Sequence, residues 1–402
     1  MLEGALSDIS VIELGSMISV PFCAKLMADL GAEVIKIESP LKGDPSRQSG
    51  PFPKDIPDQE KSGLFLYLNA NKWGITLDIN HQEGQSLLYQ LLRSADVLIH
   101  DLPPEHADDL HLNYDYLKDL NSAVVVCAIS PYGVTGPYRS FKGTPLTVSH
   151  MSGAASTVGE SEREPLALPE DRSDYFAATA AAGAILCALF ARDLDGHGQD
   201  VDIAQVDVLS SMLMGGSVAR SHAAGERVPR MGHRVVLIYP SVTLPCKDGY
   251  VSLMALEDAQ WQRLVEAMGS PDWAQSDLFQ TRRSRSTVAD ALEELLIDWA
   301  RVHTKEEIFQ LCQSNRVPAA PFYTPEEIVA HPHLAERGFF QEMEHPVAGN
   351  LIYPGAPYLL SKSPWALRHP APMLGEHNQE VYCGRMGIPL QELALMRSQG
   401  VI

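Results

Sequence analysis

One aspartate at the start of a long apolar segment is the residue in this sequence best placed to do chemistry. Asp174 closes a polar, turn-like run, and the Ala-rich residues 175–192 follow it. Ala is the best helix former, and a helix that is apolar all round is normally buried, so these residues predict a buried helix with Asp174 at its N-cap or in its first turn. Unpaired N–H groups and the positive end of the helix dipole lie there. A carboxylate kept ionised at that place can be a nucleophile, whereas the simpler interpretation is that Asp174 only caps the helix.

Strands and helices alternate before this segment. Residues 9–14 and 34–38 are predicted strands around a helix at 22–30, which makes a βαβ unit. More strands are predicted at 75–78, 97–99 and 124–129, a helix at 83–94, and a last strand and helix at 201–203 and 206–214. This alternation favours an α/β fold with a parallel, doubly wound sheet. The first loop lacks G-x-G-x-x-G, so we do not expect a dinucleotide there.

Several strings in the sequence together resemble the class III CoA-transferase family, which also contains the acyl-CoA racemases. They are A-D-L-G-A-E-V-I-K-I-E-S-P at 28–40, the Asn71-Lys72 pair, and G-H-G-Q with V-D-I-A at 196–199 and 201–204. Counted back from 196–199, Asp174 stands where the family keeps its catalytic aspartate, and this spacing favours it over the nearby Asp171. The resemblance implies an enzyme that moves coenzyme A (CoA) between an acyl-CoA and a carboxylic acid.

The resemblance also implies a set of CoA contacts and no permanently bound cofactor, because CoA arrives as part of the acyl-CoA substrate. Taken alone, a lysine in a turn, such as Lys72, is more often a solvated charge. The Gly/Pro loop at 130–138 follows a predicted strand, and such loops line ligand crevices in open α/β sheets. The implied contacts are Lys36, Arg47, Leu68, Asn71, Lys72, Asp101, Leu102, Tyr132, Gly133 and Lys142.

For the architecture, the resemblance implies a large Rossmann-like domain built from both chain ends and a smaller α+β domain between them. Residues 1–216 would form the N-terminal part of the large domain, 217–233 a linker, and 234–325 the small domain. Residues 326–402 would return and complete the large domain as a C-terminal arm. Two such chains interlock as rings in the family, so we expect an interlocked dimer. The alternative is that the arm only packs on its own domain, as many C-termini do.

The sequence departs from the family pattern at several positions. Ser39 stands where the family often has a basic residue, Asp101 where better-known members have Asn, and Asp109 where they have a second phosphate-contacting Arg. An aspartate near the CoA phosphates would weaken binding. The loop at 233–240 lacks the glycine string of the oxalate-type transferases. These departures leave open a heteromer in which this chain pairs with a paralogous subunit.

Composition and charge exclude several other classes. The chain has 31 Lys and Arg against 51 Asp and Glu, a net charge of −20, which argues against nucleic acid as a partner. No apolar run reaches the roughly 18 residues of a membrane span, so none is expected. The six cysteines form no C-x-x-C pair, which favours reduced thiols and a cytoplasmic protein. His331, His333 and His377 fit no standard ligand spacing, so no metal site is expected.

Three functions were weighed. In an acyl-CoA:carboxylate CoA-transferase, with succinyl-CoA as the candidate donor, Asp174 would form an aspartyl anhydride and then an aspartyl-CoA thioester, and backbone N–H groups near 133–136 would stabilise the oxyanions. An acyl-CoA racemase or epimerase needs a base on each face of the α-carbon. The family's Gly-His-Asp is Gly143-Thr144-Pro145 here, and His150 is out of register. A structural or regulatory subunit of a heteromeric transferase is favoured by Ser39 and Asp109 and opposed by Asp174.

Overall fold

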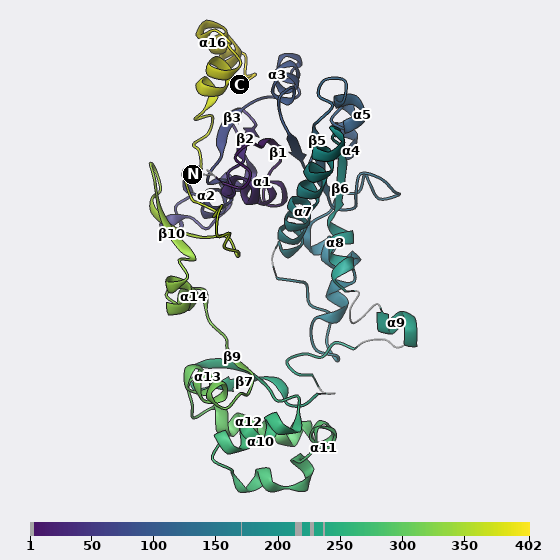
Figure 1. Ribbon diagram of the computed structural model, residues 1–402, viewed down its shortest axis with the longest axis vertical. Helices are drawn as coiled ribbons and strands as arrows, with labels where there is room; N and C mark the ends of the chain where they lie inside the picture. Colours follow the sequence, from purple (N-terminus) through teal and green to yellow (C-terminus); the bar gives the residue numbers. More distant parts are fainter. Residues whose placement is uncertain (1–3, 170, 214–218, 226–228, 236–237) are drawn as a thin grey trace. The chain divides into compact units, whose positions relative to one another are not determined.

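The computed structural model describes residues 4–169, 171–213, 219–225, 229–235 and 238–402 (Figure 1). The chain forms two compact units, and the first contains both chain ends. Unit 1 consists of Met1–Ala154, Leu168–Gly215 and His333–Ile402, and unit 2 of Ala155–Ala167 and Gly216–Pro332. The predicted division placed 155–167 in the large domain and the return at 326, whereas the structure groups 155–167 with unit 2 and returns at His333. The predicted linker lies partly outside the described residues, at 217–218 and 226–228.

Unit 1 is built on a six-stranded sheet in which all strands are parallel, as predicted. The strand order is β3-β2-β1-β4-β5-β6, so the chain starts in the middle, winds outward to β3, and then crosses to the other side. This is the Rossmann order, in which ligands bind at the carboxyl ends of the strands where the winding reverses, here between β1 and β4. The strands are β1 Ser10–Leu14, β2 Glu33–Glu38, β3 Trp73–Thr76, β4 Val97–His100, β5 Val125–Ser130 and β6 Asp200–Ala204.

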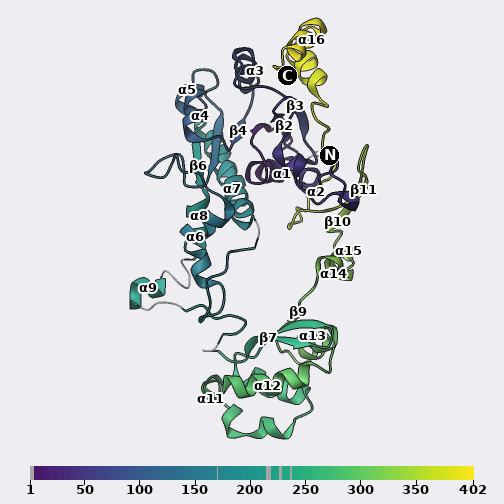
Figure 2. The same cartoon turned by 180° about the vertical axis from the view of Figure 1, so that it is seen from behind.

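Alternating side chains on these strands face two separate cores, because successive residues of a strand point to opposite faces. One set, with Val11, Val97 and Cys127, packs under α1 (Ser19–Asp29) and α7 (Arg172–Asp195). The other set, with Ile12 and Leu98, packs under α3 (Gln82–Leu92) and C-terminal residues. Figures 1 and 2 show α1 and α7 side by side on their face of the sheet, so the two helices that frame Asp174 share one core.

Helix α7 is longer than predicted and is buried on one side only. It ends at Gly196, whose φ of 81° takes the left-handed conformation that suits glycine, and Gly196 N donates to Arg192 O at 2.7 Å. Its small residues Ala177, Ala178 and Ala181 are fully buried, whereas Phe190 and Leu194 are 69% and 77% exposed. The expectation of a helix buried all round is therefore wrong for the single chain.

The expectation that no apolar segment is long enough to span a membrane is wrong for one helix. Among the described residues, α7 is the one helix long and apolar enough to span a bilayer by length and composition. Core helices of soluble proteins pass the same test, and one side of α7 packs on β5, β6 and α1.

The C-terminal part of unit 1 packs onto the start of the chain. The antiparallel hairpin of β10 (Phe340–His345) and β11 (Gly349–Pro354) leads to a π-helical turn at Gln379–Arg385 and to α16 (Leu390–Ser398). Tyr382 Oη donates to Thr76 O at 2.8 Å, and Val381 and Tyr382 are fully buried. The arm thus completes unit 1 of its own chain, an arrangement that fits both an interlocked and a simple dimer.

Shorter helices connect the main elements of unit 1. One of them, α8, continues directly from β6. They are α2 Gly63–Asn69, α4 Pro104–Asp109, α5 Tyr114–Leu117, α6 Pro145–Met151 and α8 Gln205–Met212. Among the predicted elements, those at 83–94 and 206–214 correspond to α3 and α8 with ends shifted by one or two residues.

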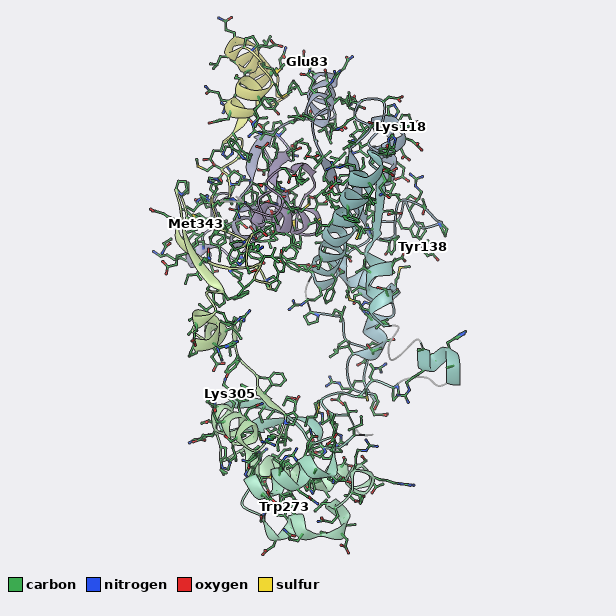
Figure 3. All side chains as sticks on the ribbon, viewed as in Figure 1. Glu83, Lys118, Tyr138, Trp273, Lys305 and Met343 are labelled. Carbon is green, nitrogen blue, oxygen red and sulfur yellow. The ribbon has the colours of Figure 1, made fainter. Side chains whose placement is uncertain are left out.

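Unit 2 is a small α+β unit with its own core. Its sheet has the order β7-β8-β9 and is antiparallel, and Trp261 is buried against it among Trp273 and Phe279. Figure 3 labels Trp273 and Lys305 in this unit. Its elements are β7 Ser241–Cys246, β8 Gly249–Met254, β9 Ala319–Pro321, α9 Ala219–Ala224, α10 Asp258–Ala267, α11 Arg282–Thr287, α12 Ala289–Ala300, α13 Lys305–Ser314 and α14 Pro325–Val329, with α15 Pro332–Glu336 at the boundary.

Candidate active site

Asp174 lies where the N-termini of three helices of unit 1 meet. It is the third residue of α7, while Ser19 and Gln205 are the first residues of α1 and α8. The N-cap of α7 is Asp171, which has a φ of 41° and makes no capping hydrogen bond. Asp174 is therefore not the N-cap residue and lies in the first turn of α7, the other place that the sequence predicted. Three helix N-termini present N–H groups and positive dipole ends, so the surroundings favour a negative charge.

The two carboxylate oxygens of Asp174 have different contacts. Ser19 Oγ donates to Oδ1 at 2.5 Å, and Gln205 Nε2 donates to the same oxygen at 2.9 Å. Gln205 Nε2 also donates to Ser19 Oγ at 3.0 Å, which closes a triangle of side chains. Among the described residues, Oδ2 contacts only the Ser173 hydroxyl, at 3.4 Å, which is beyond the usual range of an O–H···O bond.

Burial raises the pKa of the Asp174 carboxyl above its ordinary value, and hydrogen bonds from Ser19 and Gln205 oppose that rise. No cation is among the groups that shift its pKa. Asp174 thus depends on neutral donors and helix dipoles to stay ionised. A carboxylate of this kind keeps its charge available for attack on a carbonyl carbon.

A crevice of about 470 Å³ opens at the carboxyl ends of β1, β2 and β4, where the winding of the sheet reverses. The predicted contacts Asp101 and Leu102 line it, together with Ser39, Lys42 and Gln48. Burial raises the pKa of Asp101 to about 7, and the N–H of Ser16, which donates to its Oδ2 at 2.9 Å, opposes the rise. This is the position that the fold assigns to a ligand.

The loop between β1 and α1 connects this crevice with Asp174. The N–H of Ser16 donates to Asp101, the N–H of Met17 donates to Asp44 Oδ1 at 3.1 Å, and the hydroxyl of Ser19 donates to Asp174. Met17 has a φ of 58°, which is uncommon for a residue with a side chain. Three carboxylates therefore hold three residues at the end of this loop and the start of α1, which are Ser16, Met17 and Ser19.

The predicted contacts Lys36 and Lys72 are buried in an ion-pair network beneath the crevice. Lys36 Nζ lies 2.8 Å from both Glu13 Oε1 and Asp44 Oδ2, and Lys72 Nζ lies 2.7 Å from Glu13 Oε2. All four side chains have almost no exposed surface. Burial lowers the pKa of Lys72 to about 8, although Glu13 opposes this. These lysines hold the framework, and the arrangement speaks against a direct contact with a CoA phosphate.

Arg47, Asn71 and Leu68 are likewise enclosed. The Arg47 guanidinium pairs with Glu38 at 2.7 Å and stacks on the Phe65 ring at 3.6 Å, with none of its surface exposed. Asn71 Nδ2 donates to Asp29 Oδ1 at 2.6 Å, and its Oδ1 accepts from the backbone N–H of residue 368 of the C-terminal arm. Leu68 is fully buried. These residues of the family strings therefore stabilise the fold of unit 1, and their buried positions do not indicate contact with a substrate.

The loop after β5 brings the remaining predicted contacts near Gln205. Gly133 has a φ of 88°, and a Cβ there would lie 3.5 Å from Ala204. Tyr132 is partly exposed and Lys142 is exposed. The N–H of Val134 donates to both carboxylate oxygens of Asp202, at 3.1 and 3.2 Å, so it is not open to a substrate oxyanion as we expected for 133–136. Tyr138, labelled in Figure 3, is exposed in the same loop and stacks on Phe141 at 4.9 Å.

Of the positions that depart from the family pattern, Ser39 and Asp101 line the crevice, and the others lie on the surface or cap helices. Asp109 is exposed at the end of α4. Thr144, in place of the racemase histidine, caps α6, and His150 Nδ1 contacts Leu146 O at 2.7 Å. Two residues of the loop at 233–240, 236 and 237, lie outside the described residues. Within the part of the chain that the structure describes, no three His, Cys, Asp or Glu are grouped to hold a metal ion.

Sequence reasoning missed Ser19, Gln205 and Lys42. Gln205 directly follows β6, and Lys42 follows β2, so the rule that ligands bind at the carboxyl ends of parallel strands could have marked both. Ser19 follows β1 in the same way, but its contact with Asp174 depends on the approach of α1 to α7, which the sequence does not show.

The parallel sheet, its crevice and the carboxylate beside it define an α/β enzyme, and the comparisons identify its family. The chain belongs to CoA-transferase family III, whose model matches residues 6–378. It is 31% identical over 401 residues to the succinyl-CoA–D-citramalate CoA-transferase of Chloroflexus aurantiacus, covering 99% of this chain and 98% of that protein. It is 31% identical over 381 residues to the succinate–glutarate CoA-transferase of Agrobacterium fabrum, covering 94% of both.

A solved structure shares the fold over nearly the whole chain. The CAIB/BAIF family protein from Brucella suis superimposes with a TM-score of 0.86 at 28% identity, covering 95% of this chain and 99% of that one. The family and these relatives establish an enzyme of the CoA-transferase class, as the sequence strings predicted.

Proposed function

We propose that this enzyme transfers CoA from an acyl-CoA donor, succinyl-CoA, to an organic acid, with Asp174 as the covalent nucleophile. The observation that carries the proposal is the placement of Asp174 at three helix N-termini, with one oxygen held by two donors and the other without a hydrogen bond of normal length from the described residues. Relatives named for succinyl-CoA or succinate, each 31% identical, support the choice of donor.

The proposed chemistry is a double displacement. Asp174 attacks the thioester carbonyl, the C–S bond breaks, and a mixed anhydride and CoA thiolate form. The thiolate then attacks Cγ of Asp174, which releases the donor acid and leaves an aspartyl-CoA thioester. The acceptor acid runs these steps in reverse. A carboxylate suits this role because its anhydride and thioester lie close in energy to the reactants.

An adduct experiment tests the covalent step. Succinyl-CoA is mixed with the purified enzyme, and mass spectrometry should find CoA joined to Asp174 with loss of one water. Asp174→Asn should give no adduct, whereas Asp171→Asn, which changes the neighbouring acid, should still give one. With ¹⁸O-labelled glutarate as acceptor, one labelled oxygen should remain on Asp174 after a single turnover. Turnover without an adduct and without label transfer would refute the covalent route.

The crevice residues Asp101 and Leu102 and the loop residues Tyr132, Gly133 and Lys142 are the contacts that we propose for CoA. Lys42, which lines the crevice and is exposed, supplies a cation where Ser39 lacks one. Lys36, Arg47, Leu68, Asn71 and Lys72 would act indirectly, by holding the crevice. Independence from metal, nicotinamide and flavin, and a cytoplasmic location, stay predictions that chelation and cell fractionation would test.

We also propose that a second chain covers the exposed face of α7. Leu186, Phe190 and Leu194 are 40%, 69% and 77% exposed along it, which is unusual for large apolar side chains in one row of a helix. An interlocked homodimer would exchange subunits only as fast as it unfolds. Tagged and untagged dimers should therefore stay unmixed for hours, and mixed dimers within minutes would reject the interlock.

A heteromer is the second candidate for the assembly. Two relatives carry subunit names, those of Thauera aromatica for benzylsuccinate and of Chloroflexus aurantiacus for L-malate. Asp109 and Ser39 favour it. Activity of the chain purified alone would support the homodimer, and activity only with a second, related chain would support the heteromer.

A further inference from the structure

The unequal contacts of the Asp174 oxygens carry a further inference. Oδ1 accepts two hydrogen bonds from Ser19 and Gln205, which are only 6% and 7% exposed, and Oδ2 accepts none within normal range. Each donor comes from a different helix, and the bond between the two donors fixes both. Such a rigid pair on one oxygen goes beyond what is needed to neutralise a half-buried acid.

We propose that Ser19 and Gln205 select Oδ2 as the attacking oxygen and form the oxyanion hole for the carbonyl carbon of Asp174 itself. The inference rests on the proposed function, since it assumes that Asp174 becomes acylated. The groups that stabilise the oxyanion on the substrate's own thioester carbonyl are not included in this proposal.

The role follows from tracking the oxygen atoms. Oδ2 forms the bond to the donor's acyl carbon and becomes the bridging oxygen of the anhydride, while Oδ1 remains the carbonyl oxygen. When the thiolate attacks Cγ, the C–S bond forms and the electron pair of the C=O bond moves to Oδ1. The Cγ–Oδ2 bond then breaks, and Oδ2 leaves with the donor acid. In the acceptor half, attack of a carboxylate on the aspartyl-CoA thioester again places the negative charge on Oδ1.

Preformed donors at a developing oxyanion are worth about 10² to 10³ in rate each. Ser19 and Gln205 already contact Oδ1 at 2.5 and 2.9 Å, so no reorganisation is required when charge develops there. The same bonds oppose the rise in pKa that burial imposes on the free acid. One pair of side chains would thus serve the free enzyme and both tetrahedral intermediates on Cγ.

The test uses full-length protein and succinyl-CoA, and it follows formation of the CoA adduct and steady-state turnover. Ser19→Ala and Gln205→Leu should each slow adduct formation about 10²-fold with little change in KM for succinyl-CoA. The acid limb of the pH–rate profile should move to higher pH in both. Ser19→Thr, which keeps the hydroxyl, should restore most of the rate.

Gln205→Glu should respond to pH in the opposite direction from Gln205→Leu. A second carboxylate beside Asp174 would repel its charge, so the loss should be largest near neutral pH and smaller as pH falls. The control is matched in chemistry: Ser210→Ala removes a hydroxyl of α8 away from Asp174, where it donates to Val206 O at 2.7 Å. It should retain the rate and the acid limb of the wild type, and thermal melts should show that every variant is folded.

The outcomes separate this inference from the proposed function. If the wild type forms the adduct but folded Ser19→Ala and Gln205→Leu match its rate and pH profile, the inference is wrong and the proposed function stands. If the wild type turns over without any adduct on Asp174, both are wrong. A loss in Ser19→Ala that Ser19→Thr does not restore, with an unshifted acid limb, would also reject the oxyanion role.

Discussion

The ion-pair network beneath the crevice and the Asp174 site both bury carboxylates, but they neutralise them differently. Glu13 and Asp44 are paired with Lys36 and Lys72 at 2.7 to 2.8 Å, and nothing of the network reaches the surface. Burial would raise the pKa of Asp44, but the ion pair with Lys36 and the hydrogen bonds from Ser46 together lower that pKa below its ordinary value. No ion pair reaches Asp174 among the described residues, so it relies on a hydroxyl and an amide, and burial raises its pKa.

The difference separates structural from reactive carboxylates. A carboxylate bound to a cation on every side is stabilised and cannot attack, and removing one partner leaves an uncompensated buried charge. A carboxylate held through one oxygen by neutral donors keeps its charge and a free lone pair. Lysines inside a motif can therefore belong to the framework, while the reactive group sits among polar, uncharged residues.

The largest expected effect comes from removing the reactive acid. Asp174→Ala should lose roughly 10³-fold or more in turnover while the protein still folds, as expected for a covalent nucleophile. Steady-state assays and thermal melts would measure both quantities. Near-native turnover in a homogeneous sample would show that Asp174 is not the nucleophile.

Breaking the ion-pair network should lower stability and preserve activity, which is the reverse of the effect of Asp174→Ala. Lys36→Met leaves Glu13 and Asp44 short of a cation and should lower the free energy of unfolding by about 3–5 kcal/mol, while the folded fraction keeps its activity. Urea denaturation measures the change. Lys118→Met, which removes the exposed pair with Asp115, is the matched control and should leave stability unchanged. If Lys36→Met were stable but inactive, Lys36 would act in the reactive site and not in the framework.

Asp101 lies between the two regions and should make the protein sensitive to pH. Its native pKa of about 7 exceeds the ordinary 3.8, so the folded state binds more protons between these values. The stability that Asp101 contributes is therefore complete below pH 3.8 and is lost as pH rises through 7. Asp101→Asn should melt higher than the wild type at pH 8, and the gap should shrink toward pH 4.

Asp101→Asn also tests how the charge of Asp101 affects the affinity for CoA. Without the negative charge, CoA should bind about 1 kcal/mol more tightly at pH 8, or roughly fivefold, and this gain should disappear at low pH. Calorimetry with CoA at two pH values checks this. An unchanged affinity at both values would place CoA outside the crevice.

The smallest expected effect concerns an exposed cation. Lys42→Ala should weaken CoA binding by about 0.5–1 kcal/mol, and added salt should reduce the difference, because an exposed charge is screened. Lys54→Ala, an exposed lysine that does not line the crevice, is the control. Equal effects of both variants would mean that only the overall charge matters.

The sequence predicted the parallel sheet, most of its strands and the position of Asp174, because short buried apolar runs that alternate with helices, and an Ala-rich helix, leave clear patterns. It did not predict that Lys36, Arg47 and Lys72 are buried. A sequence does not distinguish an exposed lysine from one that is buried in an ion pair. Ser19 and Gln205 were missed because they meet Asp174 only when α1, α7 and α8 converge. The exposed row on α7 was missed because composition does not show which face a neighbour covers.

The loop between β1 and α1 has a thermodynamic consequence. Its residues Ser16, Met17 and Ser19 are tied to Asp101, Asp44 and Asp174 before any ligand arrives. Ordering an interface loop normally takes up part of the free energy of binding, and a loop fixed in advance has little conformational entropy left to lose. CoA that docks against this loop should thus bind with an entropy dominated by released water and by its own flexible arm.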